Sequence, residues 1–312
     1  MNKSDLRREV AELFIVRASG FNLDSQRLYP NLEASNENLK RLLEAGVGGV
    51  IFLGGTYQEL EIRCKALKQW AGKPLLLCAD IEEGVGQRFS GGTQFLPPMG
   101  IAQIYKKDPS LGISIAEKVG YFTAQESKNI GLNWLLAPVC DINNNINNPV
   151  INLRAWGEDP ETVKRLTCAY QSGVARANVL TCAKHFPGHG NSEVDSHIDL
   201  PKIQNDLSQL EKFEIIPFKS LIKQGVNSVM IGHLFFPNID PLYPATLSKK
   251  IVNDLLRIQL QFDGLVITDA LLMKAISNKY SSGIAAVMAF DAGIDLILMP
   301  EDIDEAIDAL TE

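Results

Sequence analysis

Residues 36–53 read NENLKRLLEAGVGGVIFL and contain a helix, its end and a strand in one short stretch. Apolar residues recur every three or four positions across 36–45, which predicts an amphipathic helix. Gly46 follows directly, and glycine is common at the position where a helix ends. The run 49–53 is almost entirely apolar, which indicates a strand buried on both faces, as in a parallel sheet.

The same alternation of helix and strand continues through the rest of the chain. The other apolar runs lie at 13–17, 75–80, 133–139, 180–184, 228–232, 265–269 and 295–299. Further amphipathic patterns lie at 58–70, 113–129, 159–176, 209–223, 248–260, 283–292 and 302–310. Eight strands that alternate with eight helices predict an α/β fold with a single (β/α)8 barrel of the TIM type. An open doubly wound sheet is the alternative, but no GxGxxG or GxxxxGK[ST] turn follows any strand.

The bulk properties suit a single soluble enzyme. We expect one catalytic barrel over residues 1–312, either complete or the first domain of a longer protein. A net charge of −7 gives no reason to expect nucleic acid or an anionic membrane as partner. No run approaches the roughly 18 apolar residues that a membrane span needs, and the N-terminus lacks the apolar core of a signal peptide. Five scattered cysteines indicate reduced, buried thiols, so we expect a cytoplasmic protein.

Charged side chains follow several of the apolar runs directly. In a (β/α)8 barrel the carboxyl ends of the strands form one mouth, where active sites lie. The groups that end or follow the runs are Asp80, Glu82, Asp141, Lys184, His185, His233 and Asp269. Because charged groups at such positions are costly to desolvate, they need partners or a function. We therefore expect a polar pocket at this mouth.

Three of the four histidines lie in one segment, 184–200, which reads KHFPGHGNSEVDSHIDL. Within it, Pro187, Gly188 and Gly190 predict an irregular loop. Asp195 stands two positions before His197, so its carboxylate can hold one imidazole nitrogen and raise the basicity of the other. A zinc site and a purely structural role are the alternatives, but the histidine spacing matches no common zinc motif. Acid–base chemistry is favoured, and no metal is expected.

Asp269 lies in GLVITDALLMKAI, where a strand ends and a helical stretch begins. Aspartate is a favoured helix N-cap, which is the structural interpretation of this residue. A catalytic nucleophile is the functional one. The two are compatible, because the N-terminus of a helix stabilises the ionised carboxylate that a nucleophile needs.

KHFPGHG, the following DSH and the later DGLVITDALLM together resemble bacterial β-N-acetylglucosaminidases of glycoside hydrolase family 3. The similarity extends over nearly the whole chain, and β-glucosidases of the same family lack the PGHG…DSH portion. The resemblance implies a retaining exo-enzyme that releases terminal β-linked N-acetylglucosamine. It also implies a saccharide or muropeptide substrate from peptidoglycan recycling, and no cofactor.

The resemblance also implies roles for individual residues. Asp269 matches the nucleophile, His197 the general acid/base, and Asp195 the partner that orients His197. The residues that match sugar-binding positions are Asp80, Arg88, Arg154, Lys184 and His185. For Arg88 and Arg154 the alternative is an ion pair that braces a loop, and for Asp141 we expect loop structure rather than ligand contact. Met273 is a candidate for the acetamido wall, with ordinary helix packing favoured.

One motif departs from the family pattern D-x-E-G-G-R-V-Q-R-F. Here the motif is DIEEGVGQRF, so that Val85 replaces the first arginine. Three other functions stay open: a phosphorylase, a β-glucosidase-like exo-glycosidase, and a sugar-binding module without catalysis. The sequence does not indicate an oligomeric state.

Overall fold

The computed structural model describes residues 2–192, 194–196 and 198–312. Its centre is an eight-stranded sheet in the order β10-β1-β2-β4-β6-β7-β8-β9, in which every pair is parallel. The strands are β1 (Phe14–Ala18), β2 (Gly49–Phe52), β4 (Leu76–Ala79), β6 (Trp134–Leu135), β7 (Leu180–Phe186), β8 (Ser228–Ile231), β9 (Leu265–Thr268) and β10 (Ile297–Leu298). The sheet closes because Ile267 forms a parallel bridge to Leu296, next to β10. The predicted barrel is therefore confirmed.

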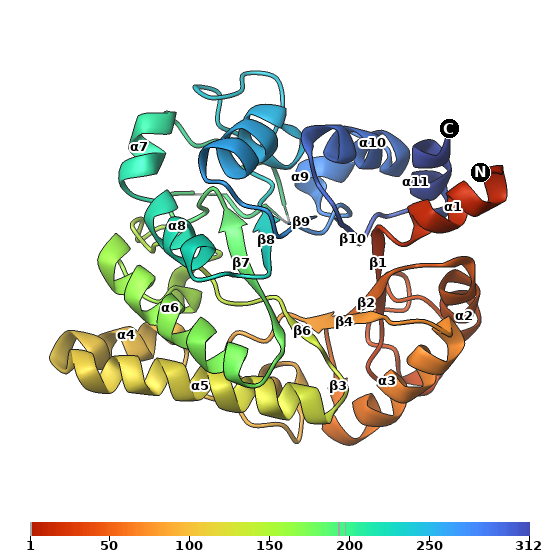
Figure 1. Cartoon of the computed structure of the whole chain (residues 1–312), viewed down its shortest axis with the longest axis horizontal. Coiled ribbons are helices and arrows are strands. Elements are labelled where there is room, and N and C mark those ends of the chain that lie inside the picture. Colours follow the sequence, from red (N-terminus) through yellow and green to blue (C-terminus); the bar gives the residue numbers. More distant parts are fainter. Residues whose placement is uncertain (1, 193, 197) are drawn as a thin grey trace.

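Helices surround this barrel, as Figure 1 shows. They are α1 (Lys3–Ala11), α2 (Asn36–Ala45), α3 (Tyr57–Ala71), α4 (Pro98–Lys107), α5 (Pro109–Asn129), α6 (Pro160–Arg176), α7 (Leu207–Lys212), α8 (Ile215–Lys223), α9 (Lys274–Ser277), α10 (Ser282–Ala292) and α11 (Ile303–Thr311). A π-helix, η5, spans Lys250–Gln259. Short 3₁₀ turns are η1 (Asp24–Gln26), η2 (Val85–Gln87), η3 (Asn152–Arg154) and η4 (Ala245–Leu247), and β3 (Gly55–Thr56) pairs with β5 (Phe89–Ser90).

Each expected strand and helix is present, with three differences. The expected helix 209–223 is divided into α7 and α8, because Phe213 leaves the helical conformation at φ −137° and ψ −78°. The segment 248–260 forms a π-helix instead of an α-helix. The helices α1 and α4 were not expected, although Pro98 at the first turn of α4 is a common helix start.

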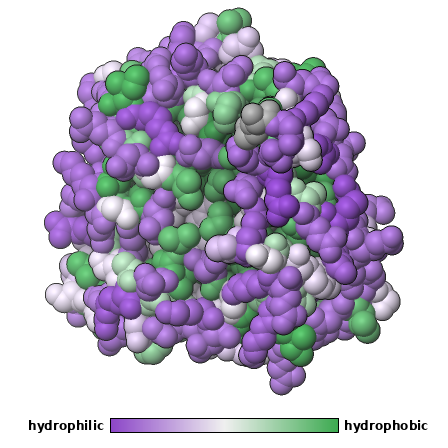
Figure 2. All heavy atoms as spheres, turned by 45° about the vertical axis from the view of Figure 1, so that its right-hand side comes forward, coloured by the Kyte–Doolittle hydropathy of each residue, from purple (hydrophilic) through white to green (hydrophobic). Residues whose placement is uncertain are grey.

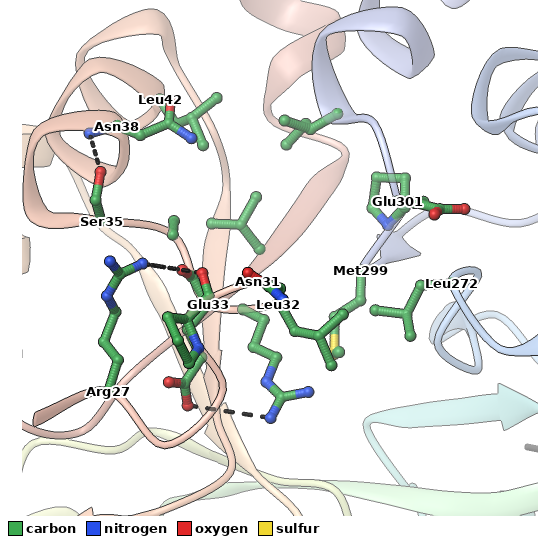
Figure 3. Close-up of a pocket in the computed structure, with 16 residues that line it drawn as sticks. Arg27, Asn31, Leu32, Glu33, Ser35, Asn38, Leu42, Leu272, Met299 and Glu301 are labelled. Atoms are coloured by element: carbon green, nitrogen blue, oxygen red, sulfur yellow. Dashed lines mark hydrogen bonds and ion pairs between the residues drawn. The ribbon is translucent and has the colours of Figure 1, made fainter. Parts of the chain in front are cut away.

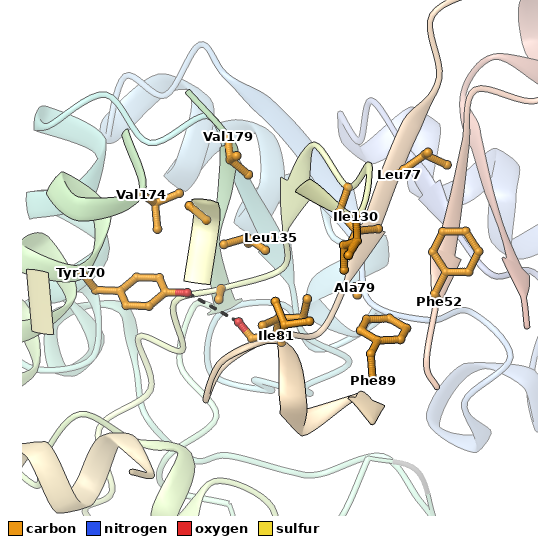
Figure 4. Close-up of a cluster of buried hydrophobic side chains, with 14 of the residues drawn as sticks. Phe52, Leu77, Ala79, Ile81, Phe89, Ile130, Leu135, Tyr170, Val174 and Val179 are labelled. Carbon is orange, nitrogen blue, oxygen red and sulfur yellow. Dashed lines mark hydrogen bonds between the residues drawn. The ribbon is translucent and has the colours of Figure 1, made fainter. Parts of the chain in front are cut away.

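Side chains inside the barrel and outside it form separate apolar layers. The interior cluster includes Ile15, Ile51, Cys78, Trp134, Cys182, Met230 and Ile267. The outward-facing residues of the strands pack against the helices in two larger clusters. Figure 4 shows part of one of them, where the Tyr170 hydroxyl donates a hydrogen bond of 3.5 Å to the carbonyl of Ile81.

The alternation of side chains along each strand places charged groups at the mouth of the barrel. Ile15, Cys78, Cys182 and Ile267 face inward. Residues two positions further along a strand face the same way. These next positions belong to Arg17, Asp80, Lys184 and Asp269. On these four strands the last inward position is therefore charged, whereas the inward positions below it are apolar.

The outer surface is mainly polar, with scattered apolar areas on the face drawn in Figure 2. Several large exposed apolar side chains belong to the loop after β1, namely Leu23, Leu28, Tyr29 and Leu32. No helix within the described ranges is long and apolar enough to cross a membrane. All five cysteines are free thiols, and only Cys168 is not buried.

Candidate active site

A cavity of about 280 Å³ opens at the carboxyl ends of β4, β7, β8 and β9. Its walls are Asp80, Glu82, Gln87, Arg88, Val150, Arg154, Lys184, His185, His189, Ser196, Met230 and Asp269. Six of the eight residues proposed from the sequence line this one cavity. They come from positions 80 to 269, so only the closed barrel brings them together.

A chain of ion pairs forms one wall of the cavity. Lys184 Nζ lies 2.7 Å from an oxygen of Asp80 and 2.7 Å from an oxygen of Glu82. The other partner of Glu82 is Arg154, whose Nε and Nη2 each donate a hydrogen bond of 2.8 Å to its carboxylate. This paired geometry is the one in which arginine binds carboxylates most strongly. The wall is therefore rigid, and Asp80 keeps an oxygen toward the cavity.

The charges in this wall stabilise one another despite burial. Burial opposes the ionised form of Glu82, but Arg154 and Lys184 outweigh it and hold the pKa of Glu82 well below its ordinary value. Burial likewise opposes the charged form of Lys184, but Asp80 and Glu82 raise the pKa of Lys184. The pKa of Arg154 is also raised, because Glu82 outweighs the effect of its burial. All three groups are therefore charged at neutral pH.

Asp141 holds the beginning of the loop after β7 in place. Its Oδ2 lies 2.7 Å from His185 Nδ1, and its Oδ1 accepts the backbone N–H of His189 at 2.6 Å. Asp141 is buried and does not line the cavity, so it acts through His185. Because Nδ1 faces a carboxylate, the other nitrogen of His185 is the one available to a ligand.

Lys184 and His185 both line the cavity although they are consecutive in the chain. Consecutive strand residues normally point to opposite faces. Here the register of β7 against β8 shifts between Ala183 and Phe186. This irregularity at the end of the strand allows both side chains to reach the same space.

His189 is a buried anchor of the same loop. Its ring nitrogens lie 2.6 Å from Ser192 Oγ and 3.2 Å from Ser196 Oγ. Burial and the neighbouring His185 lower the pKa of His189 to about 4. The ring is therefore neutral at physiological pH and holds two serines on either side of the segment that carries Asp195.

Asp269 lies at the end of β9 with one oxygen held and the other available. Its Oδ1 accepts the backbone N–H of Ala270 at 2.8 Å. Among the described residues, none donates a hydrogen bond to its second oxygen. Burial would raise the pKa of Asp269, but His233, His185 and the Ala270 N–H outweigh burial and lower it. An ionised carboxylate with a free oxygen at a cavity wall has the form of a nucleophile.

His233 supports the position of Asp269 from behind. Its Nε2 donates to the carbonyl of Ala270 at 3.0 Å, and its Nδ1 lies 2.7 Å from Thr246 Oγ1. The backbone of Ala270 is thus held at both of its polar groups, at its N–H by the Asp269 carboxylate and at its carbonyl by the His233 imidazole.

Of the seven proposed residues that the structure describes, only Asp195 is not part of this cavity wall. Asp195 is half-buried, and its carbonyl accepts the backbone N–H groups of Ile198 and Asp199. His197 lies outside the described residues. The adjacent Ser196 does line the cavity, so the loop that carries both residues reaches the site.

Several lining residues had no role in the sequence analysis. Glu82 and His189 were noticed there, whereas Gln87, Val150, Ser196 and Met230 were not. Gln87 accepts the backbone N–H of Glu82 at 2.7 Å and thereby shapes the turn after β4. The signal for Glu82 was its place two residues after Asp80, on the same side of an extended chain.

The positions of four further residues bear on expectations from the sequence. Arg88 Nε donates to the carbonyl of Asp80 at 3.0 Å, and Arg154 pairs with Glu82, so both arginines brace loops while lining the cavity. Met273 is buried and does not line the cavity. Val85, which replaces the family's first arginine, is fully buried. No group of three or more potential metal ligands exists within the part of the chain that the structure describes.

Comparison with known proteins identifies close relatives of this chain. The model of the glycosyl hydrolase family 3 N-terminal domain matches residues 5–312. A beta-hexosaminidase of Nitrosomonas eutropha is 35% identical over 272 residues, which cover 85% of this chain and 77% of that protein. A beta-hexosaminidase of Neisseria meningitidis serogroup A is 34% identical and covers 88% of this chain and 78% of its own length.

Solved structures give the same result. A family 3 beta-N-acetylglucosaminidase from Paenibacillus sp. str. FPU-7 superposes with a TM-score of 0.85 at 35% identity, covering 98% of this chain and 57% of that one. NagZ from Neisseria gonorrhoeae gives 0.80 at 30% identity, with 96% and 83% covered. The beta-glucoside phosphorylase BglX gives 0.83 at 26% identity, with 97% and 53% covered. This chain thus spans little more than half of the Paenibacillus protein.

Proposed function

The chain belongs to glycosyl hydrolase family 3, and from that premise we propose that it releases terminal β-linked N-acetylglucosamine with retention of configuration. The proposed nucleophile is Asp269. The observation that carries this assignment is its half-buried, ionised carboxylate, which has one oxygen held by Ala270 while the side chain lines the cavity. The beta-hexosaminidase relatives support the choice of sugar.

In this proposal the ion-paired wall binds the sugar. Asp80 accepts hydroxyl hydrogens of the sugar, while Lys184 and His185 donate to its oxygens. Arg88 and Arg154 lie at the edge of the same wall. Because Glu82 and Asp141 already fix Lys184, Arg154 and His185, little side-chain freedom is lost when the sugar binds.

The reaction has two displacements. The free oxygen of Asp269 attacks the anomeric carbon, the bond to the leaving oxygen breaks, and His197 donates a proton to that oxygen. A water then attacks the same carbon, gives its proton to His197 and releases Asp269. Inversion at each step gives overall retention.

An imidazole in the acid–base role has a physical advantage here. It titrates near neutral pH without a large pKa shift, and its neutral form places no second negative charge beside Asp269. We assign His197 this role with Asp195 as its orienting partner. The position of Ser196 in the cavity wall supports the assignment, because it brings this loop to the site.

The natural substrate and location are further parts of the proposal. Peptidoglycan fragments are the proposed substrate class, as the family resemblance implies. The five free thiols suit a reducing compartment, which supports a cytoplasmic location.

The test is turnover of an aryl β-N-acetylglucosaminide beside the matching β-glucoside. We expect cleavage of the first only, the β-anomer of the sugar as first product by NMR, and a loss of about a thousandfold or more in Asp269→Ala. Asp291→Ala, an exposed aspartate of α10, is the matched control and should keep full activity. Full activity in Asp269→Ala would contradict the assignment of the nucleophile.

The same assay separates hydrolysis from phosphorolysis. Added inorganic phosphate leaves the rate unchanged if water is the acceptor, and no sugar phosphate forms. For His197→Ala we expect a large loss with a poor leaving group such as phenol and a small loss with dinitrophenol, since only the former needs a proton. Equal losses with both leaving groups would remove His197 from the general-acid role.

A further inference from the structure

A second cavity, of about 310 Å³, lies at the same end of the barrel. It is bounded by the loop after β1 on one side and by the chain after β9 and β10 on the other. In Figure 3 the residues Arg27 and Glu33 belong to the first side, and Leu272, Met299 and Glu301 to the second. The proposed mechanism does not use this space.

Arg17 lies at the inner edge of this cavity. It follows Ile15 by two positions on β1, so its side chain faces the inside of the barrel. The side chain is 9% exposed, and its guanidinium donates no hydrogen bond to any described residue. Nε is fully buried and has no hydrogen-bond partner among the residues that the structure describes. The side chain is otherwise held by the ring of Tyr29, whose centroid lies 4.8 Å from Cζ.

The other charged groups around this cavity do not satisfy Arg17. The nearest oxygen of Glu33 lies 4.0 Å from Arg17 Nη2, which is too long for a hydrogen bond. Glu33 is held by the backbone N–H of Tyr29 at 3.1 Å. Arg27 is committed to the backbone carbonyls of Asp24, Pro30 and Glu33. A buried guanidinium with unmet donors is costly, so a ligand that accepts from it would gain from that deficit.

The cavity is close to the proposed site of bond cleavage. Only β10 separates β1 from β9 in the barrel, and neighbouring strands lie about 4.8 Å apart, so the two strand ends are about 10 Å apart. Leu272 lines the cavity and follows Asp269 by three residues. Arg88 of the first cavity is near enough to contribute to the lowered pKa of Arg17, after the larger effect of burial. This separation suits a group on the leaving part of the substrate rather than a group on the terminal sugar, which binds in the first cavity.

We propose that the second cavity receives an acidic group of the leaving part of the substrate, and that Arg17 binds its carboxylate. The inference rests on the proposed glycosidase function. A carboxylate fits better than a neutral oxygen, because its two oxygens match the paired N–H groups of the planar guanidinium. It also supplies the negative charge that Glu33, at 4.0 Å, does not bring within hydrogen-bond distance. Leu272 and Met299 offer an apolar wall to the carbon frame that carries the acid.

The experiment compares two disaccharides that differ only at this acid. One is N-acetylglucosamine β-linked to N-acetylmuramic acid, and the other is the same compound with its carboxylate converted to the primary amide. We expect kcat/KM for the acid to exceed that for the amide by about tenfold or more. In Arg17→Gln this ratio should fall to near one. In Arg17→Lys the ratio should lie between that of Arg17→Gln and that of the native enzyme. A ratio near one in the native enzyme, or a ratio that Arg17→Gln leaves unchanged, would overturn the proposal.

Two controls separate this result from misfolding and from failure of the glycosidase function. Arg17→Gln combined with Glu33→Gln keeps the buried pair neutral and should show the same loss of the ratio. Arg41→Gln, an exposed arginine of α2 that pairs with Asp304, should keep the native ratio. Hydrolysis of the neutral dimer of N-acetylglucosamine tests the glycosidase function itself. If that dimer is cleaved and neither of the two muramyl compounds is, the glycosidase function stands and the Arg17 proposal fails.

Discussion

Glu82 has two positively charged partners in the site. It is almost fully buried between two cations, Lys184 and Arg154, and receives three hydrogen bonds or ion pairs from them. Such a pair contributes little compared with apolar packing, but removal of one partner leaves the other charges buried without compensation. A substitution of Glu82 therefore destabilises both cations of the wall, Lys184 and Arg154, and not Glu82 alone.

For Glu82→Gln we expect a loss of about 3 kcal/mol in the free energy of unfolding. Urea denaturation at pH 7 measures it. The matched control is Glu158→Gln, which breaks an exposed pair with Lys106 and should cost less than about 1 kcal/mol. Similar small losses in both variants would show that the buried wall tolerates a missing charge.

His189 gives the protein a specific pH dependence. Its pKa is about 4 in the folded protein, lowered by burial and by His185, against an ordinary value of 6.5. Between these values the unfolded chain binds a proton that the folded chain does not. The contribution of His189 to the free energy of unfolding is therefore fully present above pH 6.5 and is lost as the pH falls toward 4.

We expect this loss to reach about 3 kcal/mol at pH 4, since the shift is about 2.5 units. The measurement is the free energy of unfolding at several pH values between 7 and 4, in the native protein and in His189→Asn. The difference between the two curves isolates His189 from the carboxylates, which titrate in both proteins. Parallel curves would mean that the pKa of His189 is the same in the folded and the unfolded protein.

At the scale of elements, the loops after β6 and β7 form one unit. Asp141 accepts from both His185 and His189, and Asn148 Nδ2 donates to the carbonyls of His189 and Gly190. The backbones also touch: a Cβ on Gly190 would lie 1.7 Å from the carbonyl oxygen of Ile142. Neither loop can move at this point without the other.

Gly190→Ala therefore separates the two loops. We expect a loss of about 3 kcal/mol in stability, because the clash is with backbone and not with a flexible side chain. Activity on the aryl substrate should fall as well, since His185 and the Asp195 segment lie on either side. Gly100→Ala is the control: it lies within α4, its Cβ would meet nothing nearer than 3.7 Å, and stability should rise slightly. Equal stability of both variants would contradict the close backbone contact.

The sequence predicted elements better than it predicted contacts between them. Glycines such as Gly46 and Gly293 do end their helices in the left-handed conformation, as expected, because this preference is local. The break between α7 and α8 and the π-helix were missed, because their apolar periodicity is nearly that of a straight α-helix.

For the site, strand-end position identified Asp80, Lys184, His185 and Asp269 as parts of one pocket. Strand-end position did not predict the ion-pair partners of these residues. Glu82 and Arg154, for example, are 72 residues apart and meet only after the barrel closes. Arg17 was overlooked for a similar reason. It ends the first apolar run, but its inward direction is evident only from the register of β1 with its neighbours.

At the scale of the whole molecule, the barrel closes where the first and last strands meet. β1 pairs with β10, and outside them Arg7 of α1 binds Asp308 of α11 at 2.8 Å. Figure 1 shows these two helices side by side. Residues from the two ends of the described chain are therefore close in space.

We expect a circular permutant to fold when a short flexible linker joins the residues after α11 to those before α1. New ends between Gln224 and Gly225 lie in an exposed turn before β8, at the end of the barrel opposite the cavity. Activity on the aryl substrate and thermal unfolding measure the outcome. New ends between Gly190 and Asn191 are the contrast and should abolish activity. Failure of both permutants to fold would show that closure depends on the order of the strands in the chain.

The buried thiols can be used to detect local opening of the barrel. Cys182 lies inside the barrel and Cys64 on the buried side of α3, and burial raises the pKa of each to about 12. A thiol reagent reacts with the ionised form, so both sites are silent while the fold is intact. Mass spectrometry after timed exposure to the thiol reagent would thus show which part of the protein opens first, and no label has to be introduced.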